Sequence, residues 1–126
     1  MTYLRKFANS GVTANATIYQ PGKFEIVKIL YAYLFLNNAE AASDSTSIRR
    51  TDSEGNSAIE YIAVSGSANE YAAADVTGLA TVTAIKWSAY PIITYPDLIT
   101  LYAPTVSGNS CSYVVEAIIS QQGYVK

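Results

Sequence analysis

Histidine is absent from this sequence of 126 residues, and cysteine, tryptophan and methionine occur once each. Histidine is the commonest general base and metal ligand in proteins, and Ser-His and Cys-His nucleophile pairs depend on it. Its absence excludes most enzyme classes, and we expect no catalytic residue. The single Cys111 excludes an internal disulfide, which fits folding in a reducing cytoplasm, and we expect it to be a small buried side chain.

Charge is also scarce. Charged residues make up 14% of the chain, the formal net charge is −2, and no block of Lys or Arg occurs. Because nucleic acids and anionic lipids are bound through clustered basic residues, we expect neither as a partner. No apolar run reaches the roughly 18 residues of a membrane span, and none of signal-peptide length follows Arg5 and Lys6. We therefore expect no membrane partner and a chain that stays in the cytoplasm where it is made.

Hydrophobic residues are abundant, at half of the sequence, and eleven residues are Tyr. This composition suits packed sheets and rigid, adhesive surfaces rather than disorder. A chain of this length forms one domain with a core of its own, without metals or disulfides. We place an N-terminal arm or edge segment at 1–22, a sandwich domain at 23–122 and a frayed tail at 123–126.

The longest apolar run is FEIVKILYAYLFL, from Phe24 to Leu36. Its Ile, Val, Tyr and Phe content favours a strand, and at about 3.3 Å per residue it would span roughly 43 Å, so we expect a bend or bulge within it. Strict alternation puts Phe24, Ile26, Leu30, Ala32, Leu34 and Leu36 on one face and Val27, Ile29, Tyr31, Tyr33 and Phe35 on the other.

Both faces of this strand are apolar, whereas a strand in a small sandwich needs only one buried face. The second face therefore predicts a covering segment or a neighbouring subunit. We expect Tyr31, Tyr33 and Phe35 to lie at this interface, although alternation does not say which face points inward. Further contacts are expected from the N-terminal segment, at Tyr3, Leu4 and Phe7.

Short apolar segments separated by Gly, Pro, Asn and Ser turns continue along the chain. They predict strands at Val12–Tyr19, Ser47–Arg50, Ser57–Val64, Ala80–Trp87, Ile92–Ile93, Leu98–Ala103 and Cys111–Ser120. The turn DSEGN predicts one hairpin, and Ser107-Gly108-Asn109 predicts a last hairpin joining the final two strands. The segment ANEYAAAD allows one helical turn, and Trp87 is expected to anchor the core. The fold class is all-β: a single-domain antiparallel sandwich or jelly roll of about seven or eight strands.

Other sites are weaker candidates. Glu60 and Glu116 lie within predicted strands, where a lone acid is usually on a solvated face rather than in a glycosidase pair. Acidic residues at Asp44, Asp52 and Glu54 could hold calcium, but their spacing matches no EF-hand, and a solvated turn is the default, so we expect no metal or other cofactor. Tyr side chains on the strands suit core packing first, then subunit contact, then stacking on sugars.

The order of segments from residue 22 to 120 resembles the small β-sandwich proteins that decorate or cement the capsids of tailed bacteriophages. The resemblance is carried by EIVKILYAYL, DSEGNSAIEYI, AIKW and PIITYPDLITLYAPTVSGNSCSYVVEAII, and it is one of pattern, so it transfers no catalytic residue. It implies closing hairpins in a jelly-roll-like sandwich. It also implies a homo-oligomer, a trimer, that is made in the host cytoplasm and bound on the capsid surface of the virion across junctions between major capsid proteins.

The leading hypothesis is therefore a structural virion protein that works by apolar burial at subunit contacts. A carbohydrate-binding module or a tail- or fibre-associated adhesin is the alternative, suggested by the many Tyr side chains. An enzyme comes third, because no constellation of residues supports one.

Overall fold

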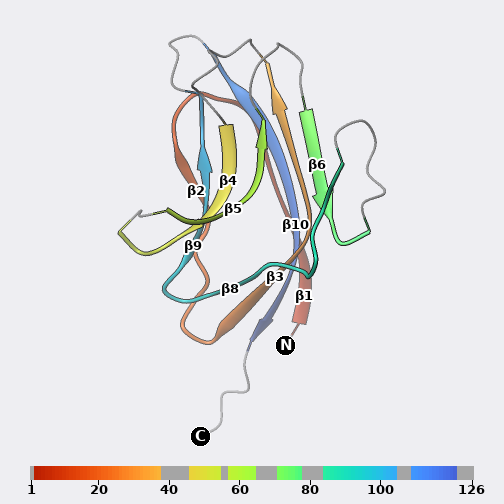
Figure 1. Ribbon diagram of the computed structural model, residues 1–126. Helices are drawn as coiled ribbons and strands as arrows, with labels where there is room; N and C mark the ends of the chain where they lie inside the picture. Colours follow the sequence, from red (N-terminus) through yellow and green to blue (C-terminus); the bar gives the residue numbers. More distant parts are fainter. Residues whose placement is uncertain are drawn as a thin grey trace, which may run out of the picture.

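The computed structural model describes residues 2–37, 46–54, 57–64, 71–77, 84–104 and 109–121, which form ten strands in two sheets packed face to face (Figure 1). The first sheet contains β1 (Thr2–Val12), β10 (Cys111–Gln121), β3 (Glu25–Leu36), β6 (Tyr71–Asp75) and β7 (Ala84–Lys86) in that order, with β8 (Ile92–Thr94) paired to the start of β3. The second sheet contains β2 (Ala16–Tyr19), β9 (Leu98–Tyr102), β4 (Thr46–Thr51) and β5 (Ser57–Val64) in that order.

The pairing of eight of these strands is nested, which is the topology of a jelly roll. In antiparallel pairs, β1 lies beside β10, β2 beside β9, β3 beside β6, and β4 beside β5. Strands β7 and β8 are additions, and β7 is the one described strand that pairs in parallel, with β6. The predicted all-β sandwich is confirmed.

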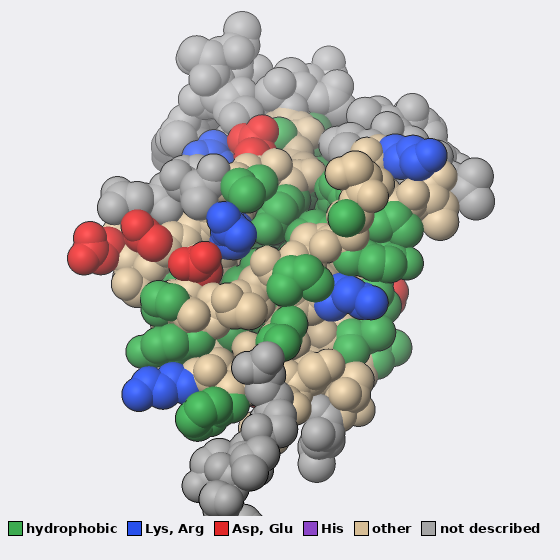
Figure 2. Space-filling view, turned by 60° about the horizontal axis from the view of Figure 1, so that its bottom comes forward, with side chains coloured by type: hydrophobic (Ala, Val, Ile, Leu, Met, Phe, Trp, Pro, Cys, Tyr) green, Lys and Arg blue, Asp and Glu red, His purple; other side chains and the backbone are tan. Residues whose placement is uncertain are grey.

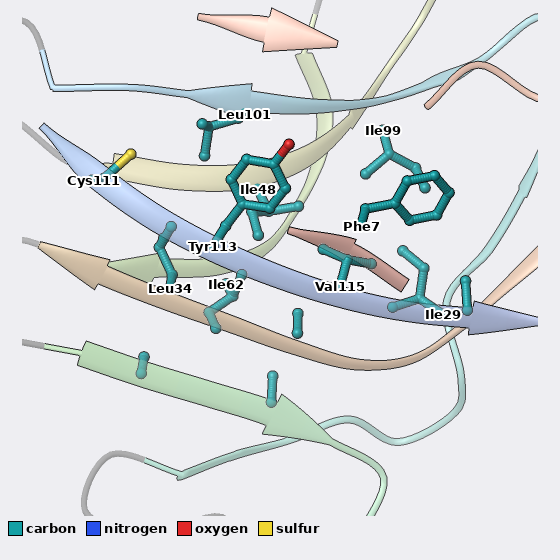
Figure 3. Packing of buried hydrophobic residues seen from close by; sticks show 14 of the residues in the cluster. Phe7, Ile29, Leu34, Ile48, Ile62, Ile99, Leu101, Cys111, Tyr113 and Val115 are labelled. Atoms are coloured by element: carbon teal, nitrogen blue, oxygen red, sulfur yellow. The ribbon is translucent and has the colours of Figure 1, made fainter. Parts of the chain in front are cut away.

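The core lies between the two sheets and is built from alternate residues of each strand (Figure 3). Side chains of the two sheets point toward one another, with Leu34, Tyr113 and Val115 from the first sheet and Ile48, Ile99 and Leu101 from the second. The expected burial of Cys111 and Trp87 is confirmed. The Trp87 indole Nε1 donates a hydrogen bond of 3.1 Å to the carbonyl of Tyr61, which satisfies its one polar group.

Two local predictions are wrong. The segment read as a possible helical turn contains β6 instead, because Ala72 and Ala74 are buried against the core and pairing with β3 overrides the helical propensity of alanine. The last two strands do not form a hairpin: β9 pairs with β2 and β4, while β10 pairs with β1 and β3 in the other sheet. The chain therefore crosses between the sheets after Tyr102.

The N-terminal residues form the edges of both sheets. Strand β1 pairs with β10 from Thr2 to Asn9, and Ser10 and Gly11 are then inserted before Val12 meets Cys111. Gly11 has a φ of 65°, the left-handed conformation typical of a glycine bulge. The chain then turns into β2, and the Asn15 side-chain oxygen fixes this corner by accepting a 2.8 Å hydrogen bond from the backbone of Ala103.

The hairpin predicted around DSEGN is confirmed by the pairing of β4 with β5, and Asp52 accepts a bond from the backbone of Glu54 at its turn. The predicted frayed tail, most of the loop after Asn37 and the turn at 105–108 lie outside the described residues. Within the described residues there is no helix, and hence none that could cross a bilayer.

Candidate interaction surface

The alternation of inward-facing and outward-facing residues along β3 shifts by one residue at Leu30. On the neighbouring strand, Ala117 is opposite Ile29 and Glu116 is opposite Tyr31, so Leu30 is an extra residue without a partner on β10. The predicted bulge is confirmed, and it changes the predicted faces. The residues that point into the core are Val27, Ile29, Ala32, Leu34 and Leu36. The side chains on the other side are Ile26, Lys28, Tyr31, Tyr33 and Phe35, all only partly buried.

The cross-strand register extends this outward-facing side over the whole first sheet. Three successive rows cross the strands: the first is Leu4, Ile118, Lys28 and Ile92, the second is Lys6, Glu116 and Tyr31, and the third is Ala8, Val114, Tyr33 and Ala73. Beyond them, Phe35 lies between Ser112 and Tyr71. We call the set Leu4, Tyr31, Tyr33, Phe35, Tyr71, Ile92, Val114 and Ile118 the outer apolar face. The described residues make only two layers, so no third layer of them covers this face.

The outward side of the second sheet provides an internal comparison. Its neighbouring side chains include Thr17, Thr100, Arg49 and Glu60 in one row, and Ser47 beside Tyr102 in the next. Arg49 forms an ion pair of 3.4 Å with Glu60, and Thr51 shares a hydrogen bond of 2.8 Å with Thr100. Thr17 and Glu60 are exposed and Arg49 and Thr100 are partly exposed, whereas Ser47 and Thr51 are buried. The exposed part of these two rows is therefore polar, unlike the aromatic and aliphatic residues on the outward side of the first sheet.

A shallow pocket of about 450 Å³ opens at the end of the outer apolar face where β10 begins and β3 ends. Its walls are residues 8–10 of β1, Tyr33 of β3, and residues 112–114 of β10. Ala8, Tyr33 and Val114 share one row of the sheet, and the bulge at Ser10 and Gly11 shapes the rim. The pocket therefore combines an aromatic ring with small and hydroxyl-bearing side chains.

Burial raises the pKa of the Tyr33 and Tyr31 hydroxyls, and for Tyr31 the nearby Tyr33, Asp75 and Glu116 add to this shift. Both hydroxyls are therefore neutral at physiological pH. Tyr33 packs against Tyr71 with ring centroids 5.7 Å apart and an interplanar angle of 41°. The aromatic part of the face is thus uncharged and partly ordered before any partner arrives.

Of the residues predicted at the interface, Tyr31, Tyr33 and Phe35 lie on the outer apolar face, and Leu4 lies there with 66% of its surface exposed. Tyr3 is also exposed, but its partner Ile119 points into the core, so Tyr3 belongs to the inward side at the end of the sandwich. The expectation for Phe7 is corrected. Phe7 is 8% exposed and belongs to the core cluster, because β1 alternates and turns it toward Val115.

Phe7 also belongs to a cluster, with Arg5, Tyr19 and Glu25, that connects β1 to β2. Its ring lies 5.1 Å from the Tyr19 ring, and the Arg5 guanidinium lies over both rings, at 4.8 and 5.2 Å. The Tyr19 hydroxyl donates a 2.6 Å hydrogen bond to Glu25, which also accepts from the backbone of Gly22. Burial and the Glu25 carboxylate raise the pKa of Tyr19, while the Gly22 bond, the Tyr19 bond and Arg5 lower the pKa of Glu25.

The sequence reasoning missed the contribution of β8 and of the outward side of β10. Ile92 is 44% exposed beside Lys28, and the Lys28 amine lies 4.9 Å from the Tyr90 ring centroid. Figure 2 looks onto this lower end of the sandwich and shows hydrophobic side chains at the surface between separate basic ones. The alternation of Val114, Glu116 and Ile118 carried the signal for β10, since two of these three outward residues are apolar.

The acidic candidates have other surroundings. Glu60 pairs with Arg49, and Glu116 lies opposite Lys6 and Tyr31 on the outward side of the first sheet. Asp52 and Glu54 share the turn after β4, while Asp44 lies outside the described residues. Across the ranges that the structure describes, no group of three or more Cys, Asp or Glu side chains could hold a metal ion.

No protein-family model matches the chain, and no curated protein matches it. Among solved structures, the chain is similar to one chain of the cyanophage Pam1 capsid asymmetric unit, with 12% sequence identity and a TM-score of 0.41. The match covers 97% of this chain and 85% of the cyanophage chain. At this identity and TM-score the likeness carries no argument about the role of this chain.

Proposed function

We propose that the chain is a structural virion protein of a tailed phage that binds other subunits through the outer apolar face. The observation that carries binding through this face is the difference between the two sheets: the outward side of the first is mostly apolar and aromatic, although Lys6, Glu116 and Lys28 also lie on it, whereas the outward side of the second is polar and ion-paired. Removal of apolar surface from water contributes about 25 cal/mol of favourable free energy per Å². Contact with a partner therefore yields more binding free energy at the first sheet than at the second.

The size of the face fits one protein partner. The first sheet has three strands of eleven or twelve residues, and at about 4.8 Å between strands and about 3.4 Å per residue they cover roughly 540 Å², to which the shorter β6 and β8 add. A stable interface of standard size buries about 800 Å² on each partner. The outward side of the first sheet, of which the outer apolar face is the apolar part, is therefore large enough for most of one interface, and Tyr side chains serve as anchors with little conformational freedom to lose.

The finer role is taken from the resemblance of residues 22–120 to capsid decoration proteins. In this role the chain forms a homo-oligomer, a trimer, and sits on the capsid surface across junctions between major capsid proteins. It stabilises the shell by burying apolar area and performs no catalysis. The pocket beside Tyr33 would then receive a side chain of the neighbouring subunit.

Sedimentation velocity between 1 and 50 µM, followed by co-sedimentation with capsids assembled without the chain, tests the proposal. The Tyr33→Lys variant places a charge in the middle of the outer apolar face and should weaken binding at least tenfold. Thr17→Lys is the matched control, because it adds the same charge to the exposed, polar outward side of the second sheet. A monomer that also fails to bind capsids would contradict the proposal.

The pocket gives one specific reason to keep the carbohydrate-binding alternative. Tyr33 offers a ring for stacking, and Ser10 and Ser112 offer hydroxyl groups at the same rim. In this case saccharides should bind the unmodified chain, and both Tyr33→Ala and Ser112→Val should abolish that binding. Subunit binding, in contrast, should survive Ser112→Val, because it does not depend on the hydroxyl group.

A further inference from the structure

Strand β1 leaves one edge of the first sheet open. It pairs with β10 on one side, and among the described residues no strand pairs with its other side (Figure 1). Along such an edge, alternate residues direct their backbone N–H and C=O groups away from the sheet, where another strand can pair with them. At eleven residues β1 is longer than most strands, so the edge is unusually long.

The edge has few of the features that normally prevent pairing. Edge strands are usually protected by proline, by bulges, by charged residues or by being short. Strand β1 contains no proline, and its bulge comes only at Ser10 and Gly11, so the register with β10 is regular from Thr2 to Asn9. The only charged residues in this regular part are Arg5 and Lys6, which stand next to each other at its centre.

These two bases make a second copy of the chain a poor partner. Residues directly opposite each other in an antiparallel pair share one face of the sheet, so two β1 strands can pair only with residues of the same face opposite each other. The two such registers with the greatest overlap set Arg5 opposite Arg5, or Lys6 opposite Lys6. Like charges directly opposite each other destabilise a strand pair, so both registers are unfavourable.

We propose that the open edge of β1 accepts an extended strand from a different protein, with two adjacent acidic residues opposite Arg5 and Lys6. Neighbouring residues of a strand point to opposite faces. Arg5 is on the inward side, held over the Phe7 and Tyr19 rings yet still exposed, and Lys6 is on the outward side. Consecutive acidic residues of the incoming strand would therefore meet one base on each face.

Arg5 and Lys6 each already have an acidic residue of the same chain nearby, but these acidic residues do not cover them. Glu116 lies opposite Lys6 from the β10 side, and Glu25 lies close enough to Arg5 for the guanidinium to lower its pKa. Both bases are nevertheless exposed on the edge. The inference goes beyond the proposed function, because strand addition uses the backbone edge of β1 and subunit binding uses the outer apolar face.

The test uses two capped peptides, TVTEEVTV and TVTKKVTV, added up to millimolar concentration to the ¹⁵N-labelled full chain. Two favourable cross-strand charge pairs instead of two unfavourable ones should make the Glu peptide bind about tenfold more tightly. The shifted amide signals should be those of Thr2 to Asn9. The charge-swapped variant K6E/E116K keeps the opposite-charge pair between β1 and β10 and the net charge, and it should abolish the preference between the peptides.

Equal binding of both peptides, an unchanged preference in K6E/E116K, or no shift of the β1 amides with either peptide would overturn the inference. A folded spectrum of each variant excludes loss of structure as the cause. Tyr33→Lys separates this inference from the proposed function, since it should leave peptide binding intact while weakening subunit binding. Failure of one of the two binding modes therefore leaves the other unaffected.

Discussion

Tyr33 and Tyr71 lie on neighbouring strands with their rings 5.7 Å apart, on the side of the first sheet that faces away from the core. Leu34, which follows Tyr33 in β3, is completely buried on the opposite side of the sheet. A single step along β3 therefore separates the core from the outer apolar face.

Leu34→Ala should lower the free energy of unfolding by about 2–5 kcal/mol, because it leaves a cavity between the sheets. Tyr33→Ala should lower it by about 1 kcal/mol or less, because the ring is already partly in water and leaves no enclosed cavity. Urea denaturation of both variants measures the difference. Losses of equal size would mean that Tyr33 is part of the core.

Deletion of Leu30 should destabilise the fold far more than Leu30→Ala. Without the extra residue, one half of β3 must turn its core side chains outward or lose its register with β10, because side chains alternate with a period of two. The alanine variant keeps the backbone bulge and removes only a partly exposed side chain. Thermal unfolding followed by circular dichroism compares them, and similar melting temperatures would refute the importance of the bulge.

The sequence was sufficient to predict the fold class, the β4–β5 hairpin and a bulge in the long strand, because these depend on local composition and length. It could not give the position of the bulge. That position depends on pairing with Glu116 and Ala117, more than eighty residues away along the chain, and this is why strict alternation assigned Val27 and Ile29 to the wrong face. The separation of β9 and β10 into two sheets is likewise invisible in either segment alone.

The candidate surface was predicted only in part, for the same reason. Tyr31, Tyr33 and Phe35 could be named because three aromatic residues alternate within one apolar run. Phe7 was misplaced because β1 has no clear periodicity, and only its pairing with Val115 shows that it points inward. Ile92 was missed because the short strand β8 joins the surface through its pairing with β3.

Gly11→Ala should lower the free energy of unfolding by about 1–2 kcal/mol, although an added Cβ would meet no atom within 4 Å. The cost comes from the positive φ of 65°, which side chains disfavour. Gly11→Asn is the matched control, because Asn tolerates this conformation and should cost less. If alanine and asparagine cost the same, conformational strain at the bulge is not the cause.

The Glu25 cluster should make stability depend on pH. The folded protein lowers the pKa of Glu25 below its ordinary value of 4.5, so the ionised carboxylate stabilises the fold above that pH. This contribution should disappear as the pH falls through the lowered folded value. The difference in unfolding free energy between the unmodified chain and Glu25→Gln should therefore shrink between pH 6 and pH 2.5. A difference that is constant over this range would contradict the prediction.

The central claim is that the outer apolar face binds other subunits. Protection of its side chains from solvent in the assembled state tests this claim most directly. Hydroxyl-radical footprinting of the Tyr side chains should be done on the free chain at low concentration and on the chain in its assembly. We predict that oxidation of Tyr31, Tyr33 and Tyr71 falls at least fivefold on assembly, while oxidation of Tyr102 on the second sheet stays the same. Unchanged oxidation of the first three, or protection of Tyr102 alone, would contradict the account.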